Sequence, residues 1–435
     1  MTYTPRKLIL LAGDFICLNL ALLATLIIRY PSSDLENQWQ NHWPYFLPVF
    51  IIWLIVLYIS DLYNLNFAGN GNSFYRSLLS ASLASTILSS LYFYLNLHSS
   101  ISPRTNLVVF LVVFLILFYF WRRSYYLLTQ RFLLSEHLAI IGSKSSVDRL
   151  AEEIEKNQGS GYRVELKITD PGQLDFAQEM ISLKKIESLV VVEDFISPGA
   201  LSRFLADCWR YEIAVFDYAS FYEYLTGKIS IETIGPTWFL KNVQTRQKKY
   251  YDWSKQIIDT GLAILLAIIS SPLWLTVALY IKLSSSGRVL FTQKRLGQDG
   301  RPFIIIKFRT MTDNSDPGQR KLITGGNFLR ATRLDELPQL INILKGEMSF
   351  IGPRPEQEEI AAQREQEIPF YRMRLLVKPG LTGWDQISGD YHSSSLPDTI
   401  AKLQHDLFYL KQRSIYLDCA IALKTIATIF SRNGR

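Results

Sequence analysis

Charged side chains are scarce in the first third of this chain, and their scarcity divides the sequence into two parts. Residues 1–134 contain eight basic and four acidic residues, so 12 of 134 are charged, about 9%. The remaining 301 residues hold the other 73 charged residues, about 24%. Because a soluble globular protein does not separate its charges in this way, we predict a membrane-embedded N-terminal part followed by water-facing domains.

Cysteine is also scarce, and histidine is unpaired. The three cysteines, Cys17, Cys208 and Cys419, are far apart, and the sequence has no CxxC motif. The five histidines form no HxxxH or HxH pair. A disulfide framework and a zinc site are therefore not expected, and a reducing cytoplasm suits the water-facing domains.

Four hydrophobic stretches predict four transmembrane helices in the first 134 residues. They are 8–28, 37–60, 77–103 and 105–121. A cleaved signal peptide is the competing interpretation of the first stretch, but no small-residue cleavage pattern follows it, so a retained anchor is favoured. Basic residues flank the start of the first span and the end of the fourth, and the 31–44 loop has none. The positive-inside rule then places both ends in the cytoplasm.

A fifth hydrophobic stretch, residues 257–281, is interrupted at its middle by Ser271-Pro272. Basic residues lie on both sides of it; they are Arg246, Lys248, Lys249 and Lys255 before it, and Lys282, Arg288, Lys294 and Arg295 after it. A helix that enters the membrane, breaks at Ser271-Pro272 and returns keeps both clusters in the cytoplasm. On this pattern alone, a proline-kinked spanning helix is equally compatible.

Residues 135–247 alternate short apolar runs with helical patterns. Strands are predicted at 138–141, 162–169, 188–192 and 213–216, and helices at 145–158 and from Ser197-Pro198 to about 211. This alternation predicts a parallel sheet with helices on its faces, as in a Rossmann-like domain. The first turn has only the first glycine of the dinucleotide fingerprint, Gly142, so a structural or regulatory domain is favoured over a cofactor-binding one.

A basic strip follows the interrupted hydrophobic stretch. Residues 288–309 carry six basic residues, Lys307 and Arg309 among them, against one acidic residue. Strands are predicted within the strip at 289–293 and 303–308. Such a strip suits anionic lipid head groups, and it equally suits a diphosphate.

The pair Asp335-Glu336 stands just before the apolar helix 340–344, so both carboxylates are predicted at a helix N-terminus, where Asp335 is expected to stay ionised. Capping is the ordinary role of such a pair. Arg330 and Arg333 crowd the same turn and favour a further role.

The segment Gly352-Pro353-Arg354-Pro355 follows this helix and sets one arginine between two prolines. Two prolines fix the backbone around Arg354, as a guanidinium that meets a phosphate in defined geometry requires. A plain proline turn is the alternative interpretation.

Five segments, in order, resemble the successive motifs of the bacterial sugar transferase family. They are 291–297, 306–311, 334–339, 345–355 and 378–384. The resemblance covers residues 248–435. The four spans and the Rossmann-like domain before it are similar to the large monotopic polyprenyl-phosphate phosphoglycosyl transferases, which include undecaprenyl-phosphate glucose and galactose phosphotransferases. The family's re-entrant helix corresponds to the segment broken at Ser271-Pro272, which favours re-entry over a kinked span.

This resemblance implies an activity. A sugar 1-phosphate is transferred from a UDP-sugar to undecaprenyl phosphate, which releases UMP and forms a polyprenyl-diphosphate-sugar through a covalent aspartyl-phosphosugar intermediate. The reaction is the first membrane step of exopolysaccharide, capsule or O-antigen synthesis. By resemblance, Asp335 is the nucleophile and a ligand of the cofactor Mg2+, and Glu336 either orients the metal or assists the acceptor phosphate.

Other family positions are implied in the same way. Those suited to phosphate contacts are Lys307, Arg309, Arg330 and Arg354, and the remaining matched residues are Asp406, Gln293, Arg295, Pro353, Pro355 and Trp384. The amphipathic stretch 405–430 either lies on the membrane or packs on the domain.

We therefore predict a membrane protein of the α plus α/β class with three parts. They are four transmembrane helices in 1–134, a Rossmann-like domain in 135–247, and a monotopic catalytic domain in 248–435 with a re-entrant helix at 257–281. The expected location is the bacterial cytoplasmic (inner) membrane, with the catalytic domain on the cytoplasmic face. The expected partners are a UDP-sugar donor, the undecaprenyl phosphate acceptor and the lipid bilayer, and a homodimer is left open.

Nucleic acid is not an expected partner, because the net charge of +7 is better assigned to lipid head groups and substrate phosphates. Two alternative functions remain open. A membrane-bound nucleotide-sugar epimerase or oxidoreductase would use the middle domain, and the missing glycines count against it. A non-catalytic scaffold for glycan assembly is disfavoured by the intact Asp335-Glu336 pair.

Overall fold

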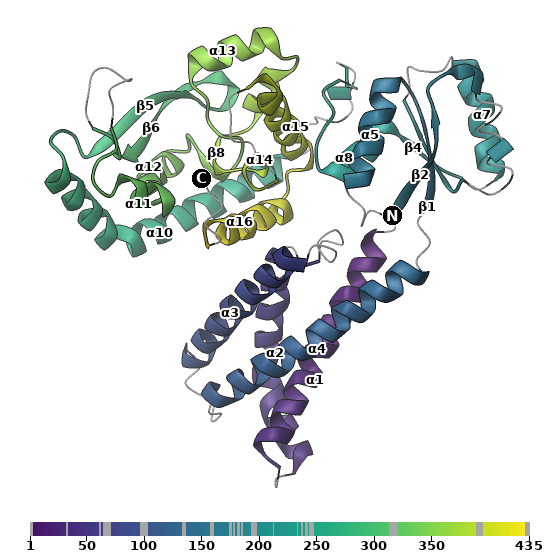
Figure 1. The fold of residues 1–435 in the computed structure, drawn as a ribbon. Coiled ribbons are helices and arrows are strands. Elements are labelled where there is room, and N and C mark those ends of the chain that lie inside the picture. Colours follow the sequence, from purple (N-terminus) through teal and green to yellow (C-terminus); the bar gives the residue numbers. More distant parts are fainter. Residues whose placement is uncertain are drawn as a thin grey trace. The chain divides into compact units, whose positions relative to one another are not determined.

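A computed structural model describes most of the chain (Figure 1). The residues it does not describe are 1–2, 32–33, 61, 64–70, 96–102, 133–135, 157–160, 174–175, 177–178, 181–182, 184–185, 193–197, 212, 233, 236–237, 240–241, 243–247, 313–320, 389–394 and 431–435. Its contacts divide the chain into two compact units, Met1–Tyr218 and Ala219–Arg435.

The first unit begins with the four predicted helices. They are α1 (Tyr3–Arg29), α2 (Leu35–Ile59), α3 (Gly71–Leu95) and α4 (Pro103–Phe132). Stretches in α1, α2 and α4 are long and apolar enough to cross a membrane, whereas the apolar part of α3, Ala81–Leu95, is shorter. These helices indicate a membrane protein, as the scarcity of charge predicts.

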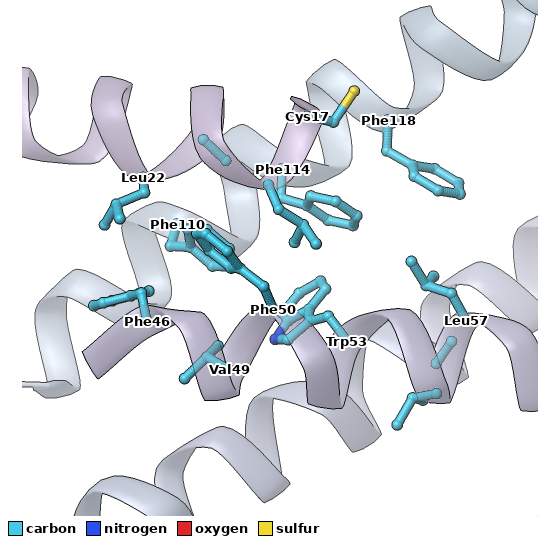
Figure 2. Packing of buried hydrophobic residues seen from close by; sticks show 14 of the residues in the cluster. Cys17, Leu22, Phe46, Val49, Phe50, Trp53, Leu57, Phe110, Phe114 and Phe118 are labelled. Carbon is cyan, nitrogen blue, oxygen red and sulfur yellow. The ribbon is translucent and has the colours of Figure 1, made fainter. Parts of the chain in front are cut away.

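Aromatic rings fill the interior of this helical part, as Figure 2 shows for Phe46, Phe50, Trp53, Phe110 and Phe114. The rings of Trp53 and Phe114 lie 4.6 Å apart, edge to face. Isoleucines cover the outside; examples more than half exposed are Ile16, Ile51, Ile87 and Ile116. An apolar exterior around an apolar interior is what a lipid environment requires.

One buried ion pair inside this part was not predicted from the sequence. Arg122 Nη2 lies 2.6 Å from Asp14 Oδ2, and both side chains are buried between α1 and α4. A Cβ on the neighbouring Gly13 would overlap the Trp121 ring, so the two helices approach closely there. Arg122 therefore neutralises a buried acid and is not a free basic flank of the fourth span.

The second half of this unit is a four-stranded parallel sheet in the order β2-β1-β3-β4, which confirms the predicted parallel sheet. Its strands are β1 (Glu136–Ile141), β2 (Tyr162–Ile168), β3 (Ser188–Val191) and β4 (Ala214–Asp217), and its long helices are α5 (Lys144–Lys156) and α7 (Pro198–Arg210). Ser197, the predicted first residue of this helix, lies outside the described residues. Leu138 to Ile141 are fully buried, as a central strand of a parallel sheet requires.

The second unit begins within α8 (Tyr218–Thr226) and continues into a segment whose Ile229, Ile231, Ile234 and Phe239 join the core built by the C-terminal helices. The remaining elements, in chain order, are α10 (Lys249–Ser284), β5 (Leu290–Leu296), the 3-10 helix η6 (Gln298–Gly300), β6 (Pro302–Phe308), α11 (Gly326–Ala331), the 3-10 helix η8 (Leu334–Glu336), α12 (Gln339–Leu344), β7 (Ser349–Ile351), α13 (Glu358–Glu367), the 3-10 helix η9 (Tyr371–Leu376), β8 (Gly380–Thr382), α14 (Trp384–Ser388), α15 (Leu396–Gln412) and α16 (Ile415–Phe430). β5 and β6 form an antiparallel hairpin, and β7 pairs with β8 in parallel.

The long apolar helix α10 is continuous from Lys249 to Ser284 with Pro272 inside it, so the predicted interruption at Ser271-Pro272 is not a gap between two helices. Ser270 and Ser271 compensate locally, because their hydroxyls donate to the carbonyls of Leu266 and Ile268. These bonds satisfy carbonyls near the position where proline removes a backbone N–H.

Both halves of α10 pack on the same unit. In the first half, Ala263 contacts a core that includes Phe303 of β6 and Leu340 of α12. In the second half, Ile281 packs in a neighbouring core with Phe308 of β6. Only 11% of the candidate span in α10 is buried, so most of its apolar surface faces outward.

The C-terminal stretch 405–430 forms parts of two helices, α15 and α16. Tyr409 and Ile421 are buried in the core of the unit, so these members of the amphipathic stripe pack on the domain. Tyr416 is 68% exposed. The side chains of Ile426 and Phe430 lie outside the described residues.

Candidate active site

Asp335 and Glu336 lie in η8, one turn before α12. The Glu336 N–H donates to the carbonyl of Arg333, which has a left-handed backbone with φ of 58°, and Pro338 then begins α12 as its N-cap. The predicted position at a helix N-terminus therefore holds to within one turn. Proline cannot supply a backbone donor, and here it separates the 3-10 turn from the helix.

Glu336 is the paired carboxylate of the two. Its Oε1 lies 2.9 Å from Lys307 Nζ and 3.6 Å from Arg333 Nη1. Burial tends to raise the pKa of Glu336, but the charge and hydrogen bond of Lys307, with the charges of Arg333 and Arg354, lower that pKa overall. Glu336 is thus held ionised.

Asp335 differs from its neighbour. Burial raises the pKa of Asp335, the charge of Glu336 raises it further, and the basic residues Lys307, Arg333 and Arg330 oppose both effects only in part. Its Oδ1 has no hydrogen-bond partner among the described residues. The expectation that a helix N-terminus keeps Asp335 fully ionised is therefore offset by burial and by Glu336.

Two of the predicted phosphate-binding arginines are engaged with protein atoms. Arg330 Nε donates to Thr310 Oγ1 at 2.9 Å. Arg309 is 5% exposed, and its two terminal nitrogens donate to the carbonyls of Ser286 and Ser285 at 2.6 and 3.0 Å. Arg309 thus closes the C-terminal end of α10 and does not join the carboxylates, whereas Arg330 lies close enough to Asp335 to affect its pKa.

The Arg354 turn places an arginine between two prolines and is held by contacts from β5. Pro353 and Pro355 are buried and Arg354 between them is exposed. Arg295 holds the turn from β5, because one of its terminal nitrogens donates to Pro355 O at 3.2 Å and the other to Gln293 Oε1 at 2.7 Å. Arg295, held by Gln293, therefore fixes the turn that carries Arg354.

Asp406 lies in a buried charged network that the sequence analysis did not recognise. Asp406 is 1% exposed and lies 2.9 Å from Arg374 Nη2, and Arg374 also donates to Arg354 O and to Glu356. Burial raises the pKa of Asp406 to about 8 against the opposing charge of Arg374, and burial also raises the pKa of the neighbouring Asp385. A single arginine set within the apolar run 373–377 was the available signal for this network.

Trp384 contacts the start of the second unit. Its indole Nε1 donates to the carbonyl of Gly227 at 2.8 Å, and its ring stacks on Phe408 with centroids 5.4 Å apart. Gly227, outside the predicted catalytic domain, therefore contacts a motif within it.

A cavity of about 550 Å³ lies beside Glu336 and Arg333. Most of its lining is apolar, from α10 and α16; these residues are Ile258, Leu262, Leu266, Ile269, Ile415 and Ala422. Gln386 and Ile387 of α14 complete one wall, and the Gln386 Nε2 has no hydrogen-bond partner among the described residues. An apolar cavity with a few convergent polar groups is the usual form of a small-molecule site.

The lining of the cavity also includes a second polar group, centred on Asp418 of α16. Lys255 Nζ and the Tyr251 hydroxyl each lie 2.8 Å from Asp418 Oδ2, and the Tyr409 hydroxyl donates to Oδ1 at 2.8 Å. Tyr409 also contacts the carbonyl of Ile351, next to the Arg354 turn. This group joins α10, α15 and α16.

The described residues contain no cluster of three or more His, Cys, Asp or Glu side chains that could hold a metal ion. Asp335 Oδ1 is an oxygen donor without a hydrogen-bond partner among the described residues, whereas Glu336 Oε1 is paired with Lys307. Mg2+ commonly binds through one or two carboxylates together with substrate phosphates and water, so Asp335 fits such an ion without a larger protein cage.

The comparisons with known proteins match the part of the chain that carries these residues. The family model described as bacterial sugar transferase matches residues 250–432. The UDP-N-acetylgalactosamine-undecaprenyl-phosphate N-acetylgalactosaminephosphotransferase of Aeromonas hydrophila is 38% identical over 244 residues, which are 54% of this chain and 57% of that protein.

Two proteins named as glucose-1-phosphate transferases are also similar to this chain. The UDP-glucose:undecaprenyl-phosphate glucose-1-phosphate transferase of Escherichia coli (strain K12) is 40% identical over 184 residues, 40% of this chain and 39% of that protein. The protein of the same name from Caulobacter vibrioides is 36% identical over 192 residues, 42% of this chain and 72% of that protein. The chain belongs to the bacterial sugar transferase family.

Proposed function

We propose that this protein transfers a sugar 1-phosphate from a UDP-sugar to undecaprenyl phosphate. The observation that carries the proposal is the position of Glu336 and Arg333 on the lining of a largely apolar cavity, with Asp335 adjacent in the chain. A transferase that moves a sugar phosphate from a water-soluble diphosphate to a lipid phosphate needs charged groups where an apolar site begins. The names of the relatives support the same reaction.

The chemistry follows from the difference between the two carboxylates. A carboxylate oxygen of Asp335 attacks the sugar-linked phosphorus of the UDP-sugar, the bond to the bridging oxygen breaks, and UMP leaves with that oxygen. An oxygen of the lipid phosphate then attacks the same phosphorus and releases Asp335. Each step exchanges one P–O bond for another, so the two substrates can occupy the site in turn.

The basic side chains stabilise charge in both steps. Lys307, Arg333 and Arg354 all act electrostatically on Glu336. They lie around the Asp335-Glu336 pair, here called the dyad. We propose that they contact the phosphate oxygens, where fixed positive charge lowers the barrier to transfer. Asp335 Oδ1 is the oxygen proposed to bind Mg2+, and the ion when bound would neutralise diphosphate charge.

The apolar part of the cavity is the proposed site of the first isoprene units of the acceptor lipid. Its walls come from α10 and α16, and the outer face of α10 is exposed and apolar. We propose that α10 is re-entrant, since its two halves pack on one unit and basic residues flank both ends. Arg246, one of these basic residues, lies outside the described residues.

The remaining predictions concern organisation and location. We propose the cytoplasmic face of the bacterial inner membrane, a Rossmann-like middle domain, and the three-part division at residues 134 and 247. Biosynthesis of exopolysaccharide, capsule or O-antigen is the proposed setting, and the homodimer stays a prediction. The transferred sugar is proposed to be glucose, galactose or N-acetylgalactosamine, the last from the name of the Aeromonas relative.

The test is UMP release by the full-length protein with undecaprenyl phosphate and Mg2+, measured across a panel of UDP-sugars. One of these three UDP-sugars should support turnover that needs the lipid phosphate. The absence of acceptor-dependent UMP release with every UDP-sugar would contradict the proposal. Chelation of divalent ions should abolish turnover, and added Mg2+ should restore it.

A further inference from the structure

We propose that the described residues between 223 and 239 (223–232, 234, 235, 238 and 239), here called the strap, position Trp384 and through it the cavity wall formed by Gln386. The strap precedes residue 250, where the family model begins. Trp384 is thus a positioning residue, and Gln386 is the group proposed to contact the lipid phosphate. This inference rests on the proposed function for its kinetic test, and a structural test independent of activity accompanies it.

Apolar side chains fix the strap to the second unit. Ile229, Ile231 and Ile234 are each less than 9% exposed and pack in one core with Leu403 and Leu407 of α15. The Ile229 N–H donates to the carbonyl of Gln404 at 3.1 Å. Because burial of large aliphatic side chains stabilises the folded state, these contacts make the strap an integral part of this unit.

Polar contacts fix Glu223, the first residue of the strap. Glu223 is 7% exposed, and both of its carboxylate oxygens are used. Oε2 lies 2.6 Å from Lys411 Nζ, and Oε1 accepts from Gln412 Nε2 at 2.7 Å. A buried carboxylate with two partners of defined geometry fixes the register of the strap on the end of α15.

The contact that links the strap to the site is the one between Gly227 and Trp384. The Trp384 Nε1 donates to the Gly227 carbonyl at 2.8 Å. Gly227 has φ of 65°, and a Cβ at this position would lie 3.1 Å from Trp384 Cζ2. Two features therefore favour glycine at position 227: the left-handed backbone and the close approach of the indole.

Trp384 transmits this position to the cavity because it begins α14, a helix of only five residues. Gln386 and Ile387, in the same short helix, line the cavity together with Glu336. The Gln386 Nε2 is buried and has no hydrogen-bond partner in the described part of the chain, so it is available to donate to a substrate oxygen. Displacement of Trp384 would move this donor relative to the dyad.

The kinetic test uses full-length protein with Trp384→Phe, which keeps an aromatic ring and removes the indole N–H. We expect KM for undecaprenyl phosphate to rise about 3- to 10-fold, the effect of one net hydrogen bond, with a smaller change in kcat. The matched control is Trp209→Phe, because Trp209 is 74% exposed in the first unit. An unchanged KM, or a loss of folded protein with unchanged constants for the folded fraction, would overturn the proposal.

A double-mutant cycle tests the route through Gln386. If Trp384 acts by positioning this side chain, Trp384→Phe should change KM for the acceptor by less than 2-fold in a Gln386→Ala background. Multiplicative effects of the two substitutions would show that Trp384 does not act through Gln386, and the proposal would fail.

Hydrogen exchange provides the readout that does not depend on catalysis. In Gly227→Ala, amides of residues 384–388 should exchange at least 10-fold faster than in the unchanged protein, whereas those of α5 in the first unit should not change. Unaltered exchange in 384–388 would overturn the strap's positioning role even if the proposed reaction is observed. Faster exchange would support the role even if no UDP-sugar is turned over.

Discussion

Lys307 donates to Glu336 at 2.9 Å, and this pairing makes the two adjacent carboxylates of the dyad unequal. Glu336 is ionised and paired with Lys307. Asp335, in contrast, has a raised pKa, and its Oδ1 lacks a hydrogen-bond partner among the described residues. Side chains with separated pKa values commonly take separate roles in catalysis. This inequality leaves Asp335 as the nucleophile of the proposed reaction.

Replacement of Asp335 by Asn should lower kcat by roughly 10³-fold or more, because an amide cannot attack phosphorus to give a stable intermediate. Glu336→Gln should cost on the order of 10²-fold, since it weakens the pairing with Lys307 but leaves the nucleophile. UMP release is the measurement. Asp299→Asn is the matched control, because Asp299 is exposed and its left-handed backbone suits asparagine. Full activity of Asp335→Asn would refute the assignment.

The acid side of the pH profile should depend on Lys307. Asp335 must be ionised to attack, so kcat/KM falls as the pH falls through its raised pKa. The Lys307 charge lowers the pKa of Asp335, and Lys307→Gln should therefore move the acid limb of kcat/KM to higher pH. The exposed Lys321 supplies the control Lys321→Gln, whose profile should match that of the unchanged protein. A limb that stays in place in Lys307→Gln would contradict the electrostatic role.

At a pH above about 8, where Asp406 is ionised, Arg374→Met should destabilise the folded protein by about 3–5 kcal/mol, because it leaves a buried carboxylate without its compensating charge. Thermal unfolding of the solubilised protein measures the change. The nearby Arg372 is exposed, and Arg372→Met should stay within about 0.5 kcal/mol. Equal unfolding temperatures for the two variants would show that the buried network contributes nothing.

The same network predicts how stability varies with pH. The folded-state pKa of Asp406, about 8, lies above that of an unfolded chain, about 3.9, so the folded protein binds more protons between these values. Its contribution to stability is therefore fully present below about pH 4 and is lost as the pH rises towards about 8. Asp406→Asn should flatten this fall in the unfolding temperature, and an unchanged slope would count against the raised pKa.

A re-entrant α10 predicts that both of its ends face the cytoplasm. In a Cys419→Ser background, cysteines introduced at Lys249 and Ser284 should react with a membrane-impermeant maleimide only after the cells are opened. A cysteine at Asp34, in the loop before α2, should react in intact cells. The native Cys17 and Cys208 are buried and should contribute little signal. Labelling at position 284 in intact cells would show that α10 spans the membrane.

Local features of the chain were predictable because they depend on neighbouring residues. Hydrophobic length marked the N-terminal helices, and the alternation of strand and helix patterns predicted the parallel sheet. The position of Asp335 near a helix start followed from Pro338, which is tolerated only near the beginning of a helix.

What the sequence by itself determined was therefore the kind of each element and the local placement of the dyad. Only the tertiary structure decided the partners of Asp14, Asp406 and Trp384, which lie 108, 32 and 157 positions away from them in the chain. It also decided that Arg309 closes a helix end and that the core of the second unit begins before residue 248. Periodicity and composition report which face of an element is buried, but they carry no information about which distant side chain meets it there. Charge pairing and close contact are decided by that meeting.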